Sequence, residues 1–353
     1  MRKCWSKKWL VVFGLLLLLI ASFALCGCGE TGEDATPPAE GQDEAQTQTD
    51  APTDVKVACI FNVPDPANGG GFERMMLEGC AAIEEKYGWQ VDIAENVAYS
   101  KISEVSSAYA DKGYDLIFYP DAGMVESWNE LADQYPDTWF CMMSLVDEMA
   151  QGNACAIRPN KFGYGVITGI VMANLSETNK IGIIGGLPVG SVMMEFSGII
   201  EGCKALYPDT EVLIGWSGDY VDVTKHSEAT RLLIEQGVDV LFTVTGPGYK
   251  GVWEAAEAGG AKIVGYAYDS YDIAPNVVAA SVAYDGPKQF LTIADAYANG
   301  TLENRFYDAG YDYITVCDFR GSIDEETEAH IRQQVEQVIS GEINIPEVLH
   351  EDL

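Results

Sequence analysis

The segment that most resembles a cofactor motif spans residues 246–251 and reads GPGYKG, a literal G-x-G-x-x-G. It lies between an expected strand at 239–243 and an expected helix from about residue 252, with Asp269 downstream. This arrangement is typical of a dinucleotide-binding loop, in which glycines let the backbone approach the pyrophosphate and an acid binds the ribose. Pro247 removes one backbone N–H from the turn, so we favour a plain glycine turn. A nucleotide-dependent oxidoreductase is the alternative.

The chain contains three histidines, His226, His330 and His350, which are far apart and lack a metal-ligand spacing. The sequence therefore offers few residues for a zinc site or for histidine-based nucleophilic catalysis. We expect a protein that is not an enzyme and that uses neither a metal nor a cofactor.

Loops after the expected strands carry aromatic, acidic and glycine residues suited to a small solute. Phe72 follows a glycine-rich loop and offers a flat stacking face, and Trp216 or Tyr220 offers a second. Asp269 has the geometry to accept hydrogen bonds from two neighbouring sugar hydroxyls. The sequence is equally consistent with Phe72 packing in the core and with Asp269 only forming a turn. The predicted ligand-binding residues are Phe72, Asp65, Asn68, Asp121, Trp216, Tyr220, Gly246, Asp269 and Tyr284.

From residue 55 onward, short apolar runs alternate with longer amphipathic stretches, which predicts parallel strands joined by crossover helices. One series of strands is expected at 55–61, 91–94, 115–119 and 138–142. After a helix at 163–175, a second series is expected at 180–184, 212–216, 239–243, 262–265 and 277–281.

The predicted fold is α/β, with two Rossmann-like lobes, parallel sheets and a hinged cleft that the carboxyl ends of the strands face. Residues 55–157 and about 286–353 are assigned to lobe 1, with a strand at 311–317 returning to it and a helix at 324–339. Residues 158–285 are assigned to lobe 2.

The N-terminus has the pattern of a secretory signal at residues 1–27, with four bases before an apolar run at 9–25. The run is shorter than the roughly 20 apolar residues of a membrane helix. Leu25-Cys26-Gly27-Cys28 resembles a lipobox, with Cys28 as the lipidated residue. A simple cleaved signal is the alternative. Residues 28–54 are rich in acids, Gly and Pro and predict a flexible tether.

Acidic residues greatly outnumber basic ones, since 21 Lys and Arg face 54 Asp and Glu, for a formal net charge of -33. Nucleic-acid binding needs a basic surface, so no nucleic-acid partner is expected. The 353 residues, 48% of them apolar, are enough for two domains. Six later cysteines show no CxxC or compact spacing, so we expect buried free thiols rather than disulfides. They are Cys59, Cys80, Cys141, Cys155, Cys203 and Cys317.

Several short motifs together resemble the basic membrane protein family of ABC-transporter substrate-binding lipoproteins. They are Gly71-Phe72, Glu78-Gly79, Gly185-Gly186, Glu201-Gly202, 218–222, 246–251 and Asp269. The resemblance implies a type I periplasmic-binding-protein fold, a purine nucleoside as ligand, an ABC permease and ATPase as partners, and a lipid anchor on the extracytoplasmic face of the cell membrane.

The resemblance also assigns roles to single residues. It implies that Phe72 stacks on the base and that Asp269 holds the ribose. The family's usual Asp-x-Ser-Phe-Asn is replaced here by GGGFE at residues 69–73, and Tyr284 stands where a lysine is often found. The alternatives that remain are another flat or hydroxylated solute such as a sugar, and a sensing role in place of transport.

Overall fold

The structure is a computed structural model that describes residues 52–68 and 71–353. The predicted signal peptide, the lipidation site Cys28 and nearly all of the predicted tether lie outside these residues. Within the described ranges, no helix has the length and apolar character needed to cross a bilayer.

The first sheet has six parallel strands in the order β11-β5-β4-β3-β1-β2. They are β1 (Lys56–Ile60), β2 (Gln90–Ala94), β3 (Leu116–Tyr119), β4 (Trp139–Met142), β5 (Ala154–Pro159) and β11 (Phe306–Ala309). The helices of this lobe are α1 (Gly71–Tyr87), α2 (Ile102–Ala110), α3 (Val125–Leu131) and α8 (Gly286–Ala298). Because side chains alternate along a strand, Val57 and Cys59 pack with α1 and α8, whereas Ala58 and Ile60 pack with α2 and α3.

The second sheet also has six strands, in the order β12-β10-β9-β8-β6-β7, and only β12 runs antiparallel. They are β6 (Lys180–Gly185), β7 (Glu211–Trp216), β8 (Val240–Val244), β9 (Lys262–Ala267), β10 (Val278–Tyr284) and β12 (Ile314–Val316). Its helices are α4 (Lys161–Leu175), α5 (Gly190–Leu206), α6 (Val223–Glu235), α7 (Tyr249–Gly259) and α9 (Glu325–Ile339). Ile183 and Phe242 face α4 and α5, whereas Ile184 and Leu241 face α6 and α7.

Short 3-10 helices interrupt the loops. They are η1 (Pro66–Asn68), η2 (Tyr99–Lys101), η3 (Ala122–Met124) and η4 (Tyr311–Tyr313). The predicted fold class, with two lobes built on parallel sheets covered by helices, is confirmed. The sequence does not predict β5 and β11. β11 is a four-residue edge strand with alternating exposure, so it lacks the continuous apolar run that marks a buried parallel strand.

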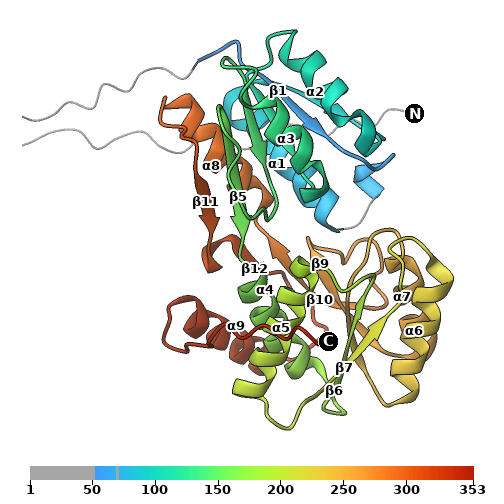
Figure 1. Cartoon of the computed structure of the whole chain (residues 1–353). Helices are drawn as coiled ribbons and strands as arrows, with labels where there is room; N and C mark the ends of the chain where they lie inside the picture. The colour runs from blue at the N-terminus through green and yellow to red at the C-terminus, as the bar shows by residue number, and fades with distance from the viewer. Residues whose placement is uncertain (1–51, 69–70) are drawn as a thin grey trace, which may run out of the picture. The chain divides into compact units, whose positions relative to one another are not determined.

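The assignment of residues 314–353 to the first lobe is wrong. β12 pairs with β10 of the second sheet, with Ile314 opposite Tyr284, and α9 packs on α4. The segment that returns to the first sheet is β11, which lies beside β5, and Figure 1 shows α8 and β11 next to the first lobe's elements. A three-residue strand carries no pattern that specifies its sheet, and β12 covers the edge that β10 would otherwise leave unpaired.

The six cysteines among the described residues form no disulfide with one another. Five of them are buried, as expected from the sequence, whereas Cys317 is half-buried. Burial raises the pKa of Cys203 and of Cys317 to about 12, which keeps both thiols protonated.

The strand order of both sheets places a ligand site at the carboxyl ends of their strands. In the first sheet the order reverses between β1 and β3, and in the second it reverses between β6 and β8. Open parallel sheets bind ligands just beyond the strand ends next to such a reversal. A ligand site is therefore expected at the loops that follow β1, β3, β6, β8 and β9.

Candidate ligand-binding site

A narrow pocket of about 20 Å³ lies beyond the carboxyl ends of β8 and β9. That volume holds about one water molecule, so a ligand ring enters only when the pocket walls separate. The second lobe supplies most of the lining, and Gly71 at the start of α1 is the contribution of the first lobe. The lining residues are Gly71, Thr243, Thr245, Tyr249, Trp253, Tyr266, Tyr268 and Ser270.

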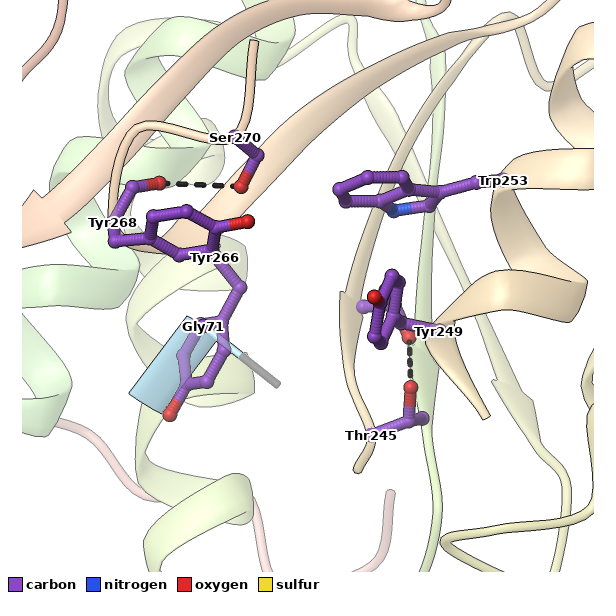
Figure 2. Close-up of a pocket in the computed structure, with 8 residues that line it drawn as sticks. Gly71, Thr245, Tyr249, Trp253, Tyr266, Tyr268 and Ser270 are labelled. Carbon is purple, nitrogen blue, oxygen red and sulfur yellow. Dashed lines mark hydrogen bonds between the residues drawn. The ribbon is translucent and has the colours of Figure 1, made fainter. Parts of the chain in front are cut away.

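Aromatic side chains form opposing walls of this pocket (Figure 2). Tyr249 and Trp253 from α7 stand on one side, with ring centroids 4.9 Å apart and an interplanar angle of 64°. Tyr268 and Ser270, which follow β9, stand on the other side. The Trp253 side chain is 9% exposed, and its Nε1 is buried without a hydrogen-bond partner in the part of the chain that the structure describes. None of the lining side chains carries a formal charge, so the pocket suits a flat, neutral group.

Two threonine hydroxyls from the end of β8 lie on the floor of the pocket. The Oγ1 of Thr243 donates to the carbonyl oxygen of Ile184 at 3.1 Å. The Oγ1 atoms of Thr243 and Thr245 are also 3.1 Å apart. Since a hydroxyl has one proton, Thr245 donates to Thr243, and the lone pairs of Thr245 remain available as acceptors.

The first lobe touches the second at the start of α1. A Cβ on Gly71 would stand 1.8 Å from the carbonyl oxygen of Tyr266, so only glycine allows this approach. The Arg74 guanidinium lies 4.6 Å from the ring centroid of Tyr268, a cation–π contact that joins α1 to the loop after β9. Between these two tyrosines, Ala267 has a φ of 66°, a left-handed conformation that non-glycine residues adopt at a cost and that is concentrated at functional sites.

A buried charge cluster lies beside the pocket. Lys161 Nζ is 2.8 Å from Glu195 Oε1, and these side chains are 6% and 1% exposed. The hydroxyls of Tyr284 and Tyr266 donate to the same oxygen at 2.8 and 3.3 Å. Burial first, and then the negative charge of Glu195, raise the pKa of both tyrosines well above the usual range. Both phenols therefore stay protonated and act as donors.

The aromatic residue predicted to stack on a ligand lies at this cluster. Lys161 Nζ is 5.0 Å from the ring centroid of Phe72 and 4.8 Å from that of Tyr284. Phe72 is half-buried and adjoins the lining residue Gly71. Tyr284 is 2% exposed and its ring stacks on that of Tyr164, so it supports the site from within the core.

Asp269 forms an ion pair with Arg320. Its two carboxylate oxygens accept hydrogen bonds from the Arg320 guanidinium, and Oδ1 also accepts from the Tyr271 N–H at 3.3 Å. In the chain it stands between the lining residues Tyr268 and Ser270 but does not itself line the pocket.

Trp216, Tyr220 and Gly246 meet at the neighbouring strand ends. The Trp216 ring stacks on that of Phe196 with centroids 5.2 Å apart, and its Nε1 is also buried without a partner among the described residues. The Tyr220 hydroxyl donates to the carbonyl oxygen of Leu187 at 3.4 Å. A Cβ on Gly246 would lie 3.3 Å from the Tyr220 carbonyl oxygen. Tyr220 and Gly246 are therefore in contact, Trp216 lies at the end of β7, and none of the three lines the pocket.

The remaining predicted residues are Asp65, Asn68 and Asp121. They lie on the first lobe, where their side chains form hydrogen bonds within its loops. Asp65 accepts from the Asn68 side chain at 2.9 Å and from its backbone N–H at 3.2 Å. Asp121 caps η3 by accepting from the Gly123 N–H at 2.7 Å, and it also accepts from the Tyr99 hydroxyl at 2.5 Å. Asn68 and both acids are exposed or half-buried, and none of the three lines the pocket.

The glycines of the G-x-G-x-x-G segment allow two helices to pack. A Cβ on Gly248 would stand 2.3 Å from the His226 ring, and one on Gly251 would stand 2.0 Å from the carbonyl oxygen of Val223. These glycines therefore let α7 approach the start of α6. This contact supports the interpretation as a glycine turn and gives no support to a cofactor loop.

Sequence reasoning misses the aromatic lining of the pocket, namely Tyr249, Trp253, Tyr266 and Tyr268. Tyr266 and Tyr268 stand two residues apart at the carboxyl end of β9, a signal that was available, although the left-handed Ala267 between them breaks the strand alternation. Trp253 sits inside an amphipathic helix, where an aromatic residue is typical of the core. Among the described residues, no group of three His, Cys, Asp or Glu side chains is placed to hold a metal ion.

Comparison with known proteins identifies the family. Residues 56–348 match the Bmp family, described as ABC transporter substrate-binding protein PnrA-like. The chain is 25% identical over 329 residues to the transcriptional activator protein med of Bacillus subtilis, which covers 92% of this chain and 94% of that protein. It is 27% identical over 263 residues to a purine-binding protein of Brucella abortus, covering 71% of each.

A solved structure shares the fold. An ABC transporter solute-binding protein from Conexibacter woesei superimposes with a TM-score of 0.71 at 21% identity, covering 84% of this chain and 100% of that one. Together with the paired parallel sheets, this likeness shows the periplasmic-binding-protein fold. The match over residues 56–348 shows that the chain belongs to the Bmp family of PnrA-like ABC transporter substrate-binding proteins.

Proposed function

We propose that this chain is an extracytoplasmic receptor that binds a purine nucleoside between its lobes and delivers it, chemically unchanged, to an ABC permease and its ATPase. The observation that carries the proposal is the uncharged pocket with facing aromatic walls, closed on one side by Gly71 of the other lobe. A purine base is flat, neutral and large enough to contact both walls. Stacking of a base on an aromatic side chain contributes about 1 to 3 kcal/mol.

The name of one relative supports a purine. The Brucella abortus relative is named for purine binding, although it is only 27% identical. In this chain Phe72 adjoins the pocket, as a base-stacking residue must, and its ring also contacts the Lys161 ammonium. The role of Asp269 in holding a ribose stays a prediction, and it requires the carboxylate to exchange Arg320 for the sugar hydroxyls.

Lobe closure follows from the placement of the pocket. A ligand that contacts both Gly71 and the aromatic walls stabilises the closed arrangement by its differential affinity for that state. A lipid anchor at Cys28 would keep such a receptor at the membrane, beside its permease. Intact-mass measurement of the protein purified from cells tests the anchor, because diacylation adds the mass of two acyl chains.

Isothermal titration calorimetry of the purified protein tests the ligand class. Inosine, guanosine and adenosine should bind with micromolar or lower dissociation constants, about -8 kcal/mol or better. Ribose, glucose and glutamine should bind at least about a hundredfold more weakly, since they lack a face to stack. Chromatography of the released ligand should return the nucleoside intact. Tight binding of a sugar without nucleoside binding, or recovery of free base, would refute the proposal.

A further inference from the structure

We infer that Trp253 and Thr245 form a hydrogen-bonding pair that reads the donor–acceptor edge of the ligand's ring, with Trp253 donating and Thr245 accepting. This inference deepens the proposed function and rests on it. It assigns specificity to two residues of the second lobe that line the pocket, as Figure 2 shows.

The unpartnered indole N–H of Trp253 is the first observation. Two other buried indoles have acceptors, because Trp89 Nε1 donates to the Pro52 carbonyl oxygen and Trp128 Nε1 donates to that of Phe140, both at 2.8 Å. Trp253 Nε1 has no acceptor among the described residues, although its ring lines the pocket. A buried donor without an acceptor is costly, so this N–H is expected to be satisfied when a ligand occupies the pocket.

The free lone pairs of Thr245 are the second observation. The Ile184 carbonyl oxygen takes the proton of Thr243, which leaves Thr245 to donate to Thr243. The Thr245 oxygen can then accept from a ligand but has no proton left to give it. The pocket thus presents one donor and one acceptor on side chains of the same lobe.

This pair selects a class of ring. The matching ligand has an acceptor for Trp253 and an N–H for Thr245 on the same edge. Hypoxanthine and guanine meet this requirement with the O6 carbonyl and the N1–H, and adenine meets it with N1 and the 6-amino group. Purine riboside keeps the acceptor but lacks the donor, whereas indole riboside keeps the stacking face and has no ring acceptor.

Trp253→Phe tests the donor, because phenylalanine keeps an aromatic wall and removes the N–H. Calorimetry should show inosine binding about tenfold to a hundredfold weaker, and indole riboside binding should change less than about threefold. Trp89→Phe is the matched control, since this buried tryptophan lies in the first lobe, stacks on Tyr87 and does not line the pocket. That variant should leave inosine affinity within about threefold.

Thr245→Val tests the acceptor independently and keeps the inference falsifiable if Trp253→Phe does not fold. Valine has nearly the shape of threonine, so we expect inosine affinity to fall about tenfold and purine riboside affinity to stay unchanged. The unliganded melting temperature and circular dichroism spectrum confirm folding of each variant.

The outcomes separate this inference from the proposed function. If wild-type protein binds inosine while both pocket variants bind it normally, or if Trp253→Phe weakens inosine and indole riboside equally, the inference is overturned and nucleoside binding stands. If Trp216→Phe weakens inosine binding and neither pocket variant does, the base lies at the neighbouring strand ends and the inference is again overturned. If the wild-type protein binds no nucleoside, both fail.

Discussion

Lys161→Met would remove the cation from a nearly inaccessible ion pair at the start of α4. Lys161 Nζ is 2.8 Å from Glu195 Oε1, and the glutamate side chain is 1% exposed. With the lysine gone, only the hydroxyls of Tyr266 and Tyr284 would remain to stabilise a carboxylate held away from water. Breaking a buried pair by removing one partner typically costs about 3 to 5 kcal/mol, because the remaining charge is uncompensated.

The double variant Lys161→Met/Glu195→Leu gives the opposite expectation. Replacing both members of a buried pair by apolar residues of similar volume is often neutral or even stabilising. The double variant should therefore recover most of the stability lost in Lys161→Met. The two substitutions should be non-additive by about 2 kcal/mol or more, as expected for side chains in direct contact.

Urea unfolding measures both effects. With a slope of about 3 kcal/mol per molar urea, Lys161→Met should lower the midpoint by about 1 to 1.7 M. Far-ultraviolet circular dichroism and tryptophan fluorescence should report coincident transitions, which licenses the comparison of midpoints. Lys101→Met is the matched control, because its partner Glu104 is within salt-bridge distance but both side chains are more than half exposed, at 61% and 72%. Its midpoint should not change measurably.

One result would refute the electrostatic reasoning. If Lys161→Met and Glu195→Leu each lower the midpoint and the double variant lowers it by the sum, then the charges do not stabilise one another. The lysine would then act through the contacts of its ammonium group with the rings of Phe72 and Tyr284.

Two further predictions concern lobe contact and pH. Gly71→Ala should weaken nucleoside binding about tenfold or more in calorimetry, because its Cβ would stand 1.8 Å from the Tyr266 carbonyl oxygen and force the lobes apart. Gly190→Ala is its control, since no heavy atom lies within 4 Å of that added Cβ, and equal loss in both would contradict the reasoning. Burial alone would raise the pKa of Glu201, but hydrogen bonds from His350 and a lysine lower it below the ordinary 4.5. A lowered pKa adds stability that is present above pH 4.5 and lost as pH falls through the lowered value. Glu201→Gln should therefore lower the urea midpoint at pH 7 and not at pH 2.5, and a pH-independent difference would count against this account.

The fold was largely predictable because parallel strands buried on both faces leave continuous apolar runs. β1, β3 and β8 have such runs, and crossover helices between them dictate parallel pairing. The edge of each sheet was less predictable. β11 and β12 are four and three residues long, and the choice between two open sheet edges depends on tertiary contacts that no local pattern records.

The candidate site was predictable in its position more than in its residues. Phe72, Gly246 and Asp269 each adjoin a residue that lines the pocket, because ligand sites of parallel sheets lie just beyond the strand ends. Neither of the two residues proposed to read the ring could be identified from sequence. Trp253 is indistinguishable from a core residue of an amphipathic helix, and the acceptor role of Thr245 depends on where a neighbouring hydroxyl places its proton.

The G-x-G-x-x-G segment shows why a motif match does not specify its chemistry. In a dinucleotide-binding loop the glycines make room for a pyrophosphate. Here Gly248 and Gly251 make room for the His226 ring and the Val223 carbonyl oxygen, so the approach that they allow is between α6 and α7. Because α7 is fixed by that contact, Tyr249 and Trp253 on its first turns are held at the pocket wall. The same glycine spacing therefore contributes to ligand binding indirectly, by positioning the helix that carries the aromatic side chains.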